Sequence, residues 1–238
     1  MTRSPGHDAP AAAPDPCEWS YEGPTGPRHW GELCPEYCVC KSGEAQSPID
    51  LSRPEMRTLP TLEFSYRETP LEVVDTGHGI RVNVGEGNCL IFGSERYSLV
   101  QYHFHTPSEH RLEGDLFDME IHFVHENEVG EGAVAGVFVK ARSGQRHPAI
   151  QEIWDRVPPS VRPPASLNPA HLLPIDRRYF RYAGSLTTPP CSEGFRWHVL
   201  RAPIEISEEQ LAEFHGWYTM NARPIQPLHG RRLLFGGN

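Results

Sequence analysis

Short segments rich in apolar residues, separated by glycine, proline and polar turns, make up most of the chain from Trp19 onward. In several segments apolar and polar residues alternate with a period of two, which is typical of strands with one buried face. The predicted strands are Leu62–Tyr66, Leu71–Asp75, Ile80–Val84, Cys89–Phe92, Tyr97–His105, Met119–His125, Ala133–Lys140, Tyr179–Ala183 and Arg196–Leu200. Their regular spacing favours a mainly β fold in which antiparallel pairs dominate.

Only two segments have a helical pattern, and neither is long. His147–Val157 has spaced apolar residues, and Ser207–Asn221 begins with Ser207 and has Gln210 three residues later, the signature of a capping box. The proline-rich stretch Val157–Pro174 is interpreted as a surface loop, because strand patterns resume after it. No internal repeat or second domain boundary is visible, so we expect a single domain.

Composition narrows the class of protein further. Among 238 residues, 38% are apolar, which is enough for a core. Residues 1–16 are rich in proline and alanine and are predicted to form a disordered tail. No apolar run approaches the roughly 18–20 residues that a membrane span needs. The net charge of −9 disfavours attraction to nucleic acid or anionic lipid.

Histidines are concentrated in two of the predicted strands. Because side chains alternate along a strand, Gln101, His103 and His105 share one face of the first. If the second strand is its neighbour, two histidines from one strand and one from the other would converge on a point. Three imidazoles leave the fourth tetrahedral position of zinc to water, which is the pattern of a catalytic zinc site.

The second strand has two histidines, on opposite faces. His122 shares its face with Glu120 and Val124, whereas His125 lies on the other face. Glu120 and Gln101 would accept hydrogen bonds from the imidazoles and fix their orientation, which favours His122 as the third ligand. The alternative is that these are ordinary histidines in a polar pocket, and the pattern alone leaves both interpretations open.

Other polar residues lie near this cluster in the chain. Glu109 follows the histidine pair by a short loop, and Thr187 and Thr188 lie in a proline-rich loop that would suit either a hydroxyl-bearing site or an ordinary turn. His78, between two glycines, is predicted to be an exposed turn residue whose imidazole would titrate near roughly 6.5.

The six cysteines do not have the paired spacing of a structural zinc site. Their even number is compatible with disulfides and an oxidising compartment. Residues 1–16 contain no apolar segment of the kind found in signal peptides, so these observations leave the compartment open.

Taken together, the motifs resemble the α-class carbonic anhydrases, and the resemblance covers residues 17–238. The matching motifs, in chain order, are Trp19-x-Tyr21, Gly26-Pro-x-x-Trp30, Gln46-Ser-Pro-Ile49, Gly77-His78, Gln101-x-His-Phe-His105, Ser108-Glu-His110, Glu120-x-His-x-Val124, Ser185-Leu-Thr-Thr-Pro-Pro190, Trp197 and Arg223-Pro-x-Gln-Pro-Leu228. So many distinct motifs in one order make the resemblance specific. It implies a large, twisted, mostly antiparallel central sheet with a few short peripheral helices.

The resemblance also implies roles for individual residues. His103, His105 and His122 would bind Zn²⁺, with Gln101 and Glu120 as hydrogen-bond acceptors behind them. Glu109 would accept from Thr187, which would orient a zinc-bound hydroxide; Thr188 would help to place bicarbonate, and His78 would be the proton shuttle. The apolar residues against which carbon dioxide would lie are Val124, Val134, Leu186 and Trp197.

The activity implied is reversible hydration of carbon dioxide to bicarbonate and a proton, by attack of zinc-bound hydroxide. A minor esterase activity is a further expectation, and an acatalytic binding module with the same fold is the rival from another class. The implied partner is a small molecule rather than nucleic acid or a membrane, and the protein is expected to be a monomer or homodimer.

Some features of the chain depart from the best-known family members. Arg81 and Thr76 stand at cavity positions where amides are common, and Arg81 is expected to lower the pKa of His78. Thr106 follows the histidine pair where an aromatic residue is common in animal members.

The cysteines resemble those of family members outside the cytoplasm. Cys191 is expected to pair with Cys40, or as a second choice with Cys38. Cys17 would pair with Cys34 or Cys38, and Cys89 would be a buried free thiol. A periplasmic or secreted location follows from this resemblance.

Overall fold

The computed structural model describes residues 17–144, 146–157 and 163–237. The predicted tail, residues 1–16, lies outside the described residues. The strands are β1 (Glu55–Met56), β2 (Leu62–Ser65), β3 (Thr69–Pro70), β4 (Glu72–Asp75), β5 (Ile80–Asn83), β6 (Cys89–Phe92), β7 (Glu95–His105), β8 (Met119–Glu126), β9 (Gly132–Arg142), β10 (Ser166–Leu167), β11 (Tyr179–Ser185), β12 (Glu193–Ser207) and β13 (Leu234–Gly236). All nine predicted strands are confirmed.

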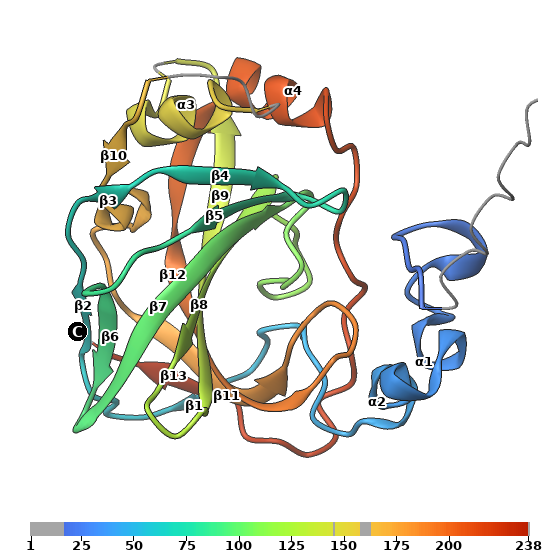
Figure 1. The fold of residues 1–238 in the computed structure, drawn as a ribbon. Helices are drawn as coiled ribbons and strands as arrows, with labels where there is room; N and C mark the ends of the chain where they lie inside the picture. The colour runs from blue at the N-terminus through green and yellow to red at the C-terminus, as the bar shows by residue number, and fades with distance from the viewer. Residues whose placement is uncertain (1–16, 145, 158–162, 238) are drawn as a thin grey trace, which may run out of the picture.

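Eleven strands form one large mixed sheet in the order β1-β13-β11-β12-β9-β8-β7-β5-β4, with β6 also pairing with β7 and β2 with β6. The pairs β9 with β12 and β1 with β13 are parallel, and the other pairs of this sheet are antiparallel. The expectation of a mainly antiparallel sheet is therefore confirmed. Figure 1 shows β7, β8 and β9 crossing the middle of the molecule, where the longest strands lie.

Short helices lie around the sheet (Figure 1). They are the α-helices α1 (Trp30–Leu33), α2 (Val39–Ser42), α3 (Pro148–Trp154) and α4 (Glu208–His215), and the 3₁₀ helices η1 (Gly23–Thr25), η2 (Pro35–Tyr37) and η3 (Pro169–Leu172). Among the described helices, none is long and apolar enough to cross a membrane.

The capping box of α4 is confirmed, since Ser207 Oγ accepts from Gln210 N and the Gln210 side chain accepts from Ser207 N. The predicted C-terminus of this helix, Asn221, is wrong. The helix ends at His215, because Gly216 follows it and glycine is a poor helix former. The chain beyond it extends so that Asn221 can bond to the backbone of Phe104 and Thr106.

The proline-rich stretch Val157–Pro174 is only partly a surface loop. Residues 158–162 lie outside the described residues, but the rest contains β10 and η3. Leu167 and Leu172 of these elements are buried in the core, because apolar side chains this large gain from leaving water.

The two faces of the central sheet have different cores. One face carries Tyr102, Phe104, Ile121 and Phe123, which pack with residues of α3 and α4. On the other face a smaller apolar cluster, including Val134, Phe138, Trp197 and Val199, surrounds a group of polar side chains. The period-two alternation of the strands creates this division, and the polar face carries the histidine cluster.

Candidate metal centre

Three histidines converge on the polar face of the sheet. His103 and His122 are directly paired across β7 and β8, and His105 is paired with Glu120. One ligand atom from each of His103, His105 and His122 lies within 4.8 Å of the others. His125 instead lies on the opposite face, where its Nε2 is 2.6 Å from the Tyr66 hydroxyl.

Each ring has an oxygen atom close to one of its nitrogens, and for His103 and His105 this contact is a hydrogen bond. His103 Nδ1 is 2.8 Å from Gln101 Oε1, and His105 Nδ1 is 2.7 Å from the backbone oxygen of Asn221. His122 Nε2 is 3.1 Å from Glu120 Oε1. Gln101 and Glu120 thus lie behind the histidines, as predicted, whereas no local pattern pointed to the Asn221 carbonyl.

The remaining ring nitrogens face the centre of the cluster. His105 Nε2 is buried and has no hydrogen-bond partner, an arrangement that is costly unless something else binds it. Burial lowers the pKa of His105 to about 4 and also lowers the pKa of His103 and His122. Neutral imidazoles are the form that binds metals, so this donor set fits a divalent cation such as zinc.

Glu120 anchors the cluster from behind. Its Oε2 accepts hydrogen bonds from the backbone N–H groups of Glu109 and His110, at 3.0 and 2.8 Å. Its Oε1 is 2.7 Å from His110 Nδ1. Burial by itself raises the pKa of Glu120, but the attraction of His110 and His122 outweighs it and holds the pKa well below the usual range. Glu120 is therefore an ionised acceptor for His122.

The network continues away from the histidines. His110 Nε2 is 2.6 Å from the Tyr182 hydroxyl, which is 2.8 Å from Ser47 Oγ. All three side chains are buried. Sequence reasoning did not assign roles to Tyr182 or Ser47, because the contacts join segments far apart in the chain.

Glu109 lies beside the cluster, also fully buried. Its Oε2 is 3.6 Å from His105 Nε2 and 3.7 Å from His122 Nδ1, and its Oε1 accepts from Arg223 N at 2.7 Å. Burial raises the pKa of Glu109 to about 7, while the nearby His122 and Thr187 side chains oppose the rise. The expected hydrogen bond between Glu109 and Thr187 stays a prediction.

A cavity of about 220 Å³ opens above the histidines. His103, His105, Thr188, His78 and Arg81 are among the residues that line it.

The half-buried His78 stacks on Trp19, with ring centroids 3.8 Å apart and planes 13° from parallel. Burial lowers the pKa of His78, and Arg81, which was expected to do so, is not among the causes.

The apolar residues expected near the site form a row across the sheet. Val124 of β8 pairs with Val134 of β9, which pairs with Trp197 of β12. Val134 and Trp197 are buried, whereas Val124 and Leu186 line a second hollow next to Gln101. The row lies directly beside the histidine row, because Gln101 is the partner of Val124.

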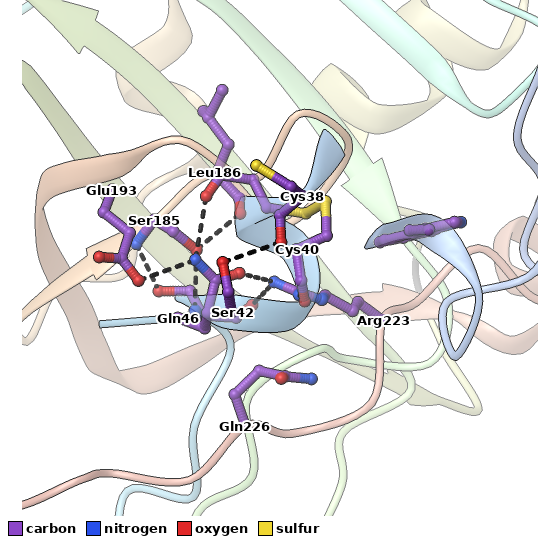
Figure 2. Close-up of a disulfide and its surroundings, with 12 residues drawn as sticks. Cys38, Cys40, Ser42, Gln46, Ser185, Leu186, Glu193, Arg223 and Gln226 are labelled. Carbon is purple, nitrogen blue, oxygen red and sulfur yellow. Dashed lines mark hydrogen bonds between the residues drawn. A yellow bond between two sulfur atoms is a disulfide. The ribbon is translucent and has the colours of Figure 1, made fainter. Parts of the chain in front are cut away.

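A disulfide joins Cys40 to Cys191, the pairing that the resemblance implied as first choice. Figure 2 shows it surrounded by polar side chains that include Gln46 and Arg223. Gln46 Nε2 donates to Cys191 O, and Arg223 Nη2 donates to Cys40 O. Since Cys191 N also donates to Thr188 O at 2.9 Å, this disulfide anchors the threonine loop beside the histidines.

The other four cysteines form one further disulfide and two free thiols. Cys17 pairs with Cys34 rather than with Cys38, which is an exposed free thiol. Cys89 is a buried free thiol, as expected.

Comparisons with known proteins agree on one family. Residues 25–236 match the family model described as eukaryotic-type carbonic anhydrase. A carbonic anhydrase of Nostoc sp. is 39% identical over 226 residues, 91% of this chain and 85% of that protein. The solved structure of α-carbonic anhydrase from Thermovibrio ammonificans, in complex with the inhibitor sulfanilamide, has a TM-score of 0.86 and 41% identity, covering 92% of this chain and 99% of that one.

A solved structure of dioscorin complexed with ascorbate is also similar, with a TM-score of 0.84 and 33% identity, covering 93% of this chain and 98% of that one.

Proposed function

The chain belongs to the eukaryotic-type, or α-class, carbonic anhydrase family, and we propose that it hydrates carbon dioxide reversibly at a zinc ion bound by His103, His105 and His122. Family membership supports the carbonate dehydratase activity. The observation that carries the zinc site is the convergence of three neutral imidazoles, two of them buried, with the unpartnered Nε2 of His105 among them. Residues 17–238 would form the catalytic domain.

The residues present fit zinc, which His103 and His105 would bind through Nε2 and His122 through Nδ1. When bound, zinc supplies the Lewis acidity that makes water a nucleophile near neutral pH. Gln101, Glu120 and the Asn221 carbonyl hold the opposite nitrogens, so the three rings keep their orientation.

Thr187 and Glu109 would orient the reacting oxygen. The Thr187 hydroxyl would donate its proton to the Glu109 carboxylate, which would leave its oxygen free to accept a hydrogen bond from the nucleophile. A cation at the histidines would attract the carboxylate and lower its pKa, which keeps Glu109 in the accepting form.

Carbon dioxide has no charge, so an apolar surface is the appropriate place for it. Val124 and Leu186 line the hollow next to Gln101, and Val134 and Trp197 are buried. Thr188, which lines the cavity with the histidines, would help to place bicarbonate. Bicarbonate and carbon dioxide would then be the small-molecule partners.

His78 would move the proton released by the reaction to bulk solvent. Its ring is at the cavity wall and half exposed, and its pKa below 6.5 makes it neutral, and thus a proton acceptor, at pH 7.

The same nucleophile would attack an activated ester, so we expect a slow esterase side activity. A binding role without catalysis is the rival function, and the intact histidine set argues against it. Two disulfides support a periplasmic or secreted location, where thiols oxidise. We propose that the protein acts as a monomer or homodimer.

The decisive experiment combines metal analysis with activity. The purified protein is expected to contain about one zinc per chain and to lose carbon dioxide hydration when a chelator removes it. His105→Ala should lose both zinc and activity. His125→Gln, which changes a histidine on the opposite face, should keep both.

Activity that survives chelation and His105→Ala would overturn the zinc proposal. Full zinc occupancy without hydration activity would instead favour the binding role.

A further inference from the structure

Arg81 lies in the same row of the sheet as the histidines. On β5 it pairs directly with His103 of β7, which pairs in turn with His122 of β8. Side chains directly opposite each other on neighbouring strands point to the same face, with Cβ atoms about 5 Å apart. Arg81 therefore reaches the cavity that His103, His105, His78 and Thr188 also line.

The Arg81 guanidinium has no acidic partner. Its Nε is buried without a hydrogen-bond partner, and within the described parts of the chain Arg81 takes part in no ion pair. Several other arginines do, as Arg196 with Glu95 and Arg232 with Glu55 illustrate. An arginine that lines a cavity without a carboxylate partner has donors available for a ligand.

The two buried carboxylates of the histidine cluster already have other partners. Glu120 is occupied by His110 and two backbone N–H groups, and Glu109 accepts from Arg223 N. The cavity wall thus has a permanent positive charge beside a group of neutral imidazoles. A cation bound by those imidazoles would add to this charge.

We propose that Arg81 is an anion-binding residue that holds bicarbonate, and other small monovalent anions, in the cavity beside the histidines. This inference rests on the proposed function, since bicarbonate is the anionic member of the reacting pair. Carbon dioxide is neutral and gains nothing from the guanidinium. Arg81 therefore distinguishes the product of hydration from its substrate.

We expect Arg81 to change the affinity for anions and not kcat/KM. Hydration and dehydration share one equilibrium constant, so kcat/KM in the two directions must change together. A residue that holds the bound anion without changing the transition state lowers the dissociation constant of the anion and leaves both kcat/KM values as they were.

The test compares Arg81→Gln with the unchanged enzyme. Inhibition constants are measured for nitrate and, as product inhibitor of hydration, for bicarbonate. Both should rise about fivefold to tenfold in Arg81→Gln, because a charged donor is lost, while kcat/KM for carbon dioxide stays within about twofold. Arg81→Lys, which keeps the charge without the fork of donors, should lie between the two.

Arg96→Gln is the matched control. Arg96 is exposed, has no ion pair among the described residues, and lies outside this cavity, so the same charge is removed elsewhere. Its inhibition constants should not change. Equal effects of Arg96→Gln and Arg81→Gln, or no change in Arg81→Gln, would overturn the proposal.

Calorimetric titration of the zinc-loaded enzyme with nitrate separates this inference from the proposed function. If nitrate binding depends on Arg81 but the protein has no hydration activity, the proposed function is wrong and this inference stands. If the protein hydrates carbon dioxide but Arg81→Gln does not change nitrate binding, this inference is wrong and the proposed function stands.

Discussion

The three clustered histidines use their two ring nitrogens differently. His103 and His105 are held through Nδ1, and His122 through Nε2, so the nitrogens left for a ligand are Nε2, Nε2 and Nδ1. The acceptors of His103 and His105 also fix the tautomer, because each requires a proton on the nitrogen that it binds. The contacts within the protein therefore already determine which ring nitrogen of each histidine is available to an ion.

His78 carries the first prediction at this scale. Replacing it with alanine should slow carbon dioxide hydration about tenfold or more in weak buffer, because a positioned proton acceptor is lost. Added imidazole should restore part of the rate. Burial lowers the pKa of His78, so its contribution should be present at neutral pH and disappear as the pH falls through a value below 6.5. Stopped-flow assays at several buffer concentrations measure this.

His171→Ala provides the control, because that histidine is exposed and outside the cavity. An unchanged rate for His78→Ala in weak buffer would assign proton transfer to another group.

Side chains alternate between the two faces along each strand, and pairing of the strands aligns those on one face into rows across the sheet. Arg81, His103, His122 and Gly136 occupy one row across β5, β7, β8 and β9. The neighbouring row contains Gln101, Val124, Val134 and Trp197. His103 and His122 thus occupy a row directly beside the row of apolar residues in a single sheet, and a slip of one residue in register would separate them.

Gly136 carries a prediction at the scale of the element. A Cβ atom at this position would lie 2.9 Å from Glu120 Oε1, closer than real contacts allow. Gly136→Ala should therefore displace the carboxylate that orients His122 and weaken zinc binding about 10-fold to 100-fold. Competition with a chromogenic chelator measures the affinity.

Ala135→Gly is a suitable control. Ala135 is the neighbouring residue on the opposite face of β9, so this change costs stability but does not touch Glu120. Zinc affinity that is unchanged in folded Gly136→Ala would contradict the role assigned to this glycine.

Across the whole molecule, the Cys40–Cys191 disulfide and Arg223 tie the N-terminal segment to the site. Arg223 donates to Cys40 O, Ser47 O and Gln46 Oε1, while its backbone N–H donates to Glu109. Segments more than 140 residues apart, such as those of Cys40 and Cys191, meet here. The N-terminal segment therefore helps to support the cavity at the histidines.

The two disulfides should contribute unequally to stability. The half-cystines are separated by 151 residues in Cys40–Cys191 and by 17 in Cys17–Cys34. Loop entropy of the unfolded chain predicts a loss of about 5 kcal/mol for Cys40→Ser with Cys191→Ser, and about 3 kcal/mol for Cys17→Ser with Cys34→Ser. Urea unfolding monitored by tryptophan fluorescence measures both. A larger loss from the shorter loop would contradict this entropic origin.

The sequence by itself determined the strands and the faces of their side chains. Alternation is a local property, so the histidine face of β7 and β8 follows from residue order once the strands are recognised. The motifs, taken together, determined the family. The capping box of α4 is equally local, and it was predicted correctly.

Only the tertiary structure decided which distant groups meet. The Asn221 carbonyl behind His105, the Tyr182–Ser47 pair behind His110, the stacking of Trp19 on His78 and the choice of Cys34 over Cys38 join segments that no periodicity connects. The same cause explains the position of Asn221 beyond the end of α4, where its side chain bonds with the backbone of Phe104 and Thr106. Long-range contacts depend on how the chain closes in space, which local patterns do not encode.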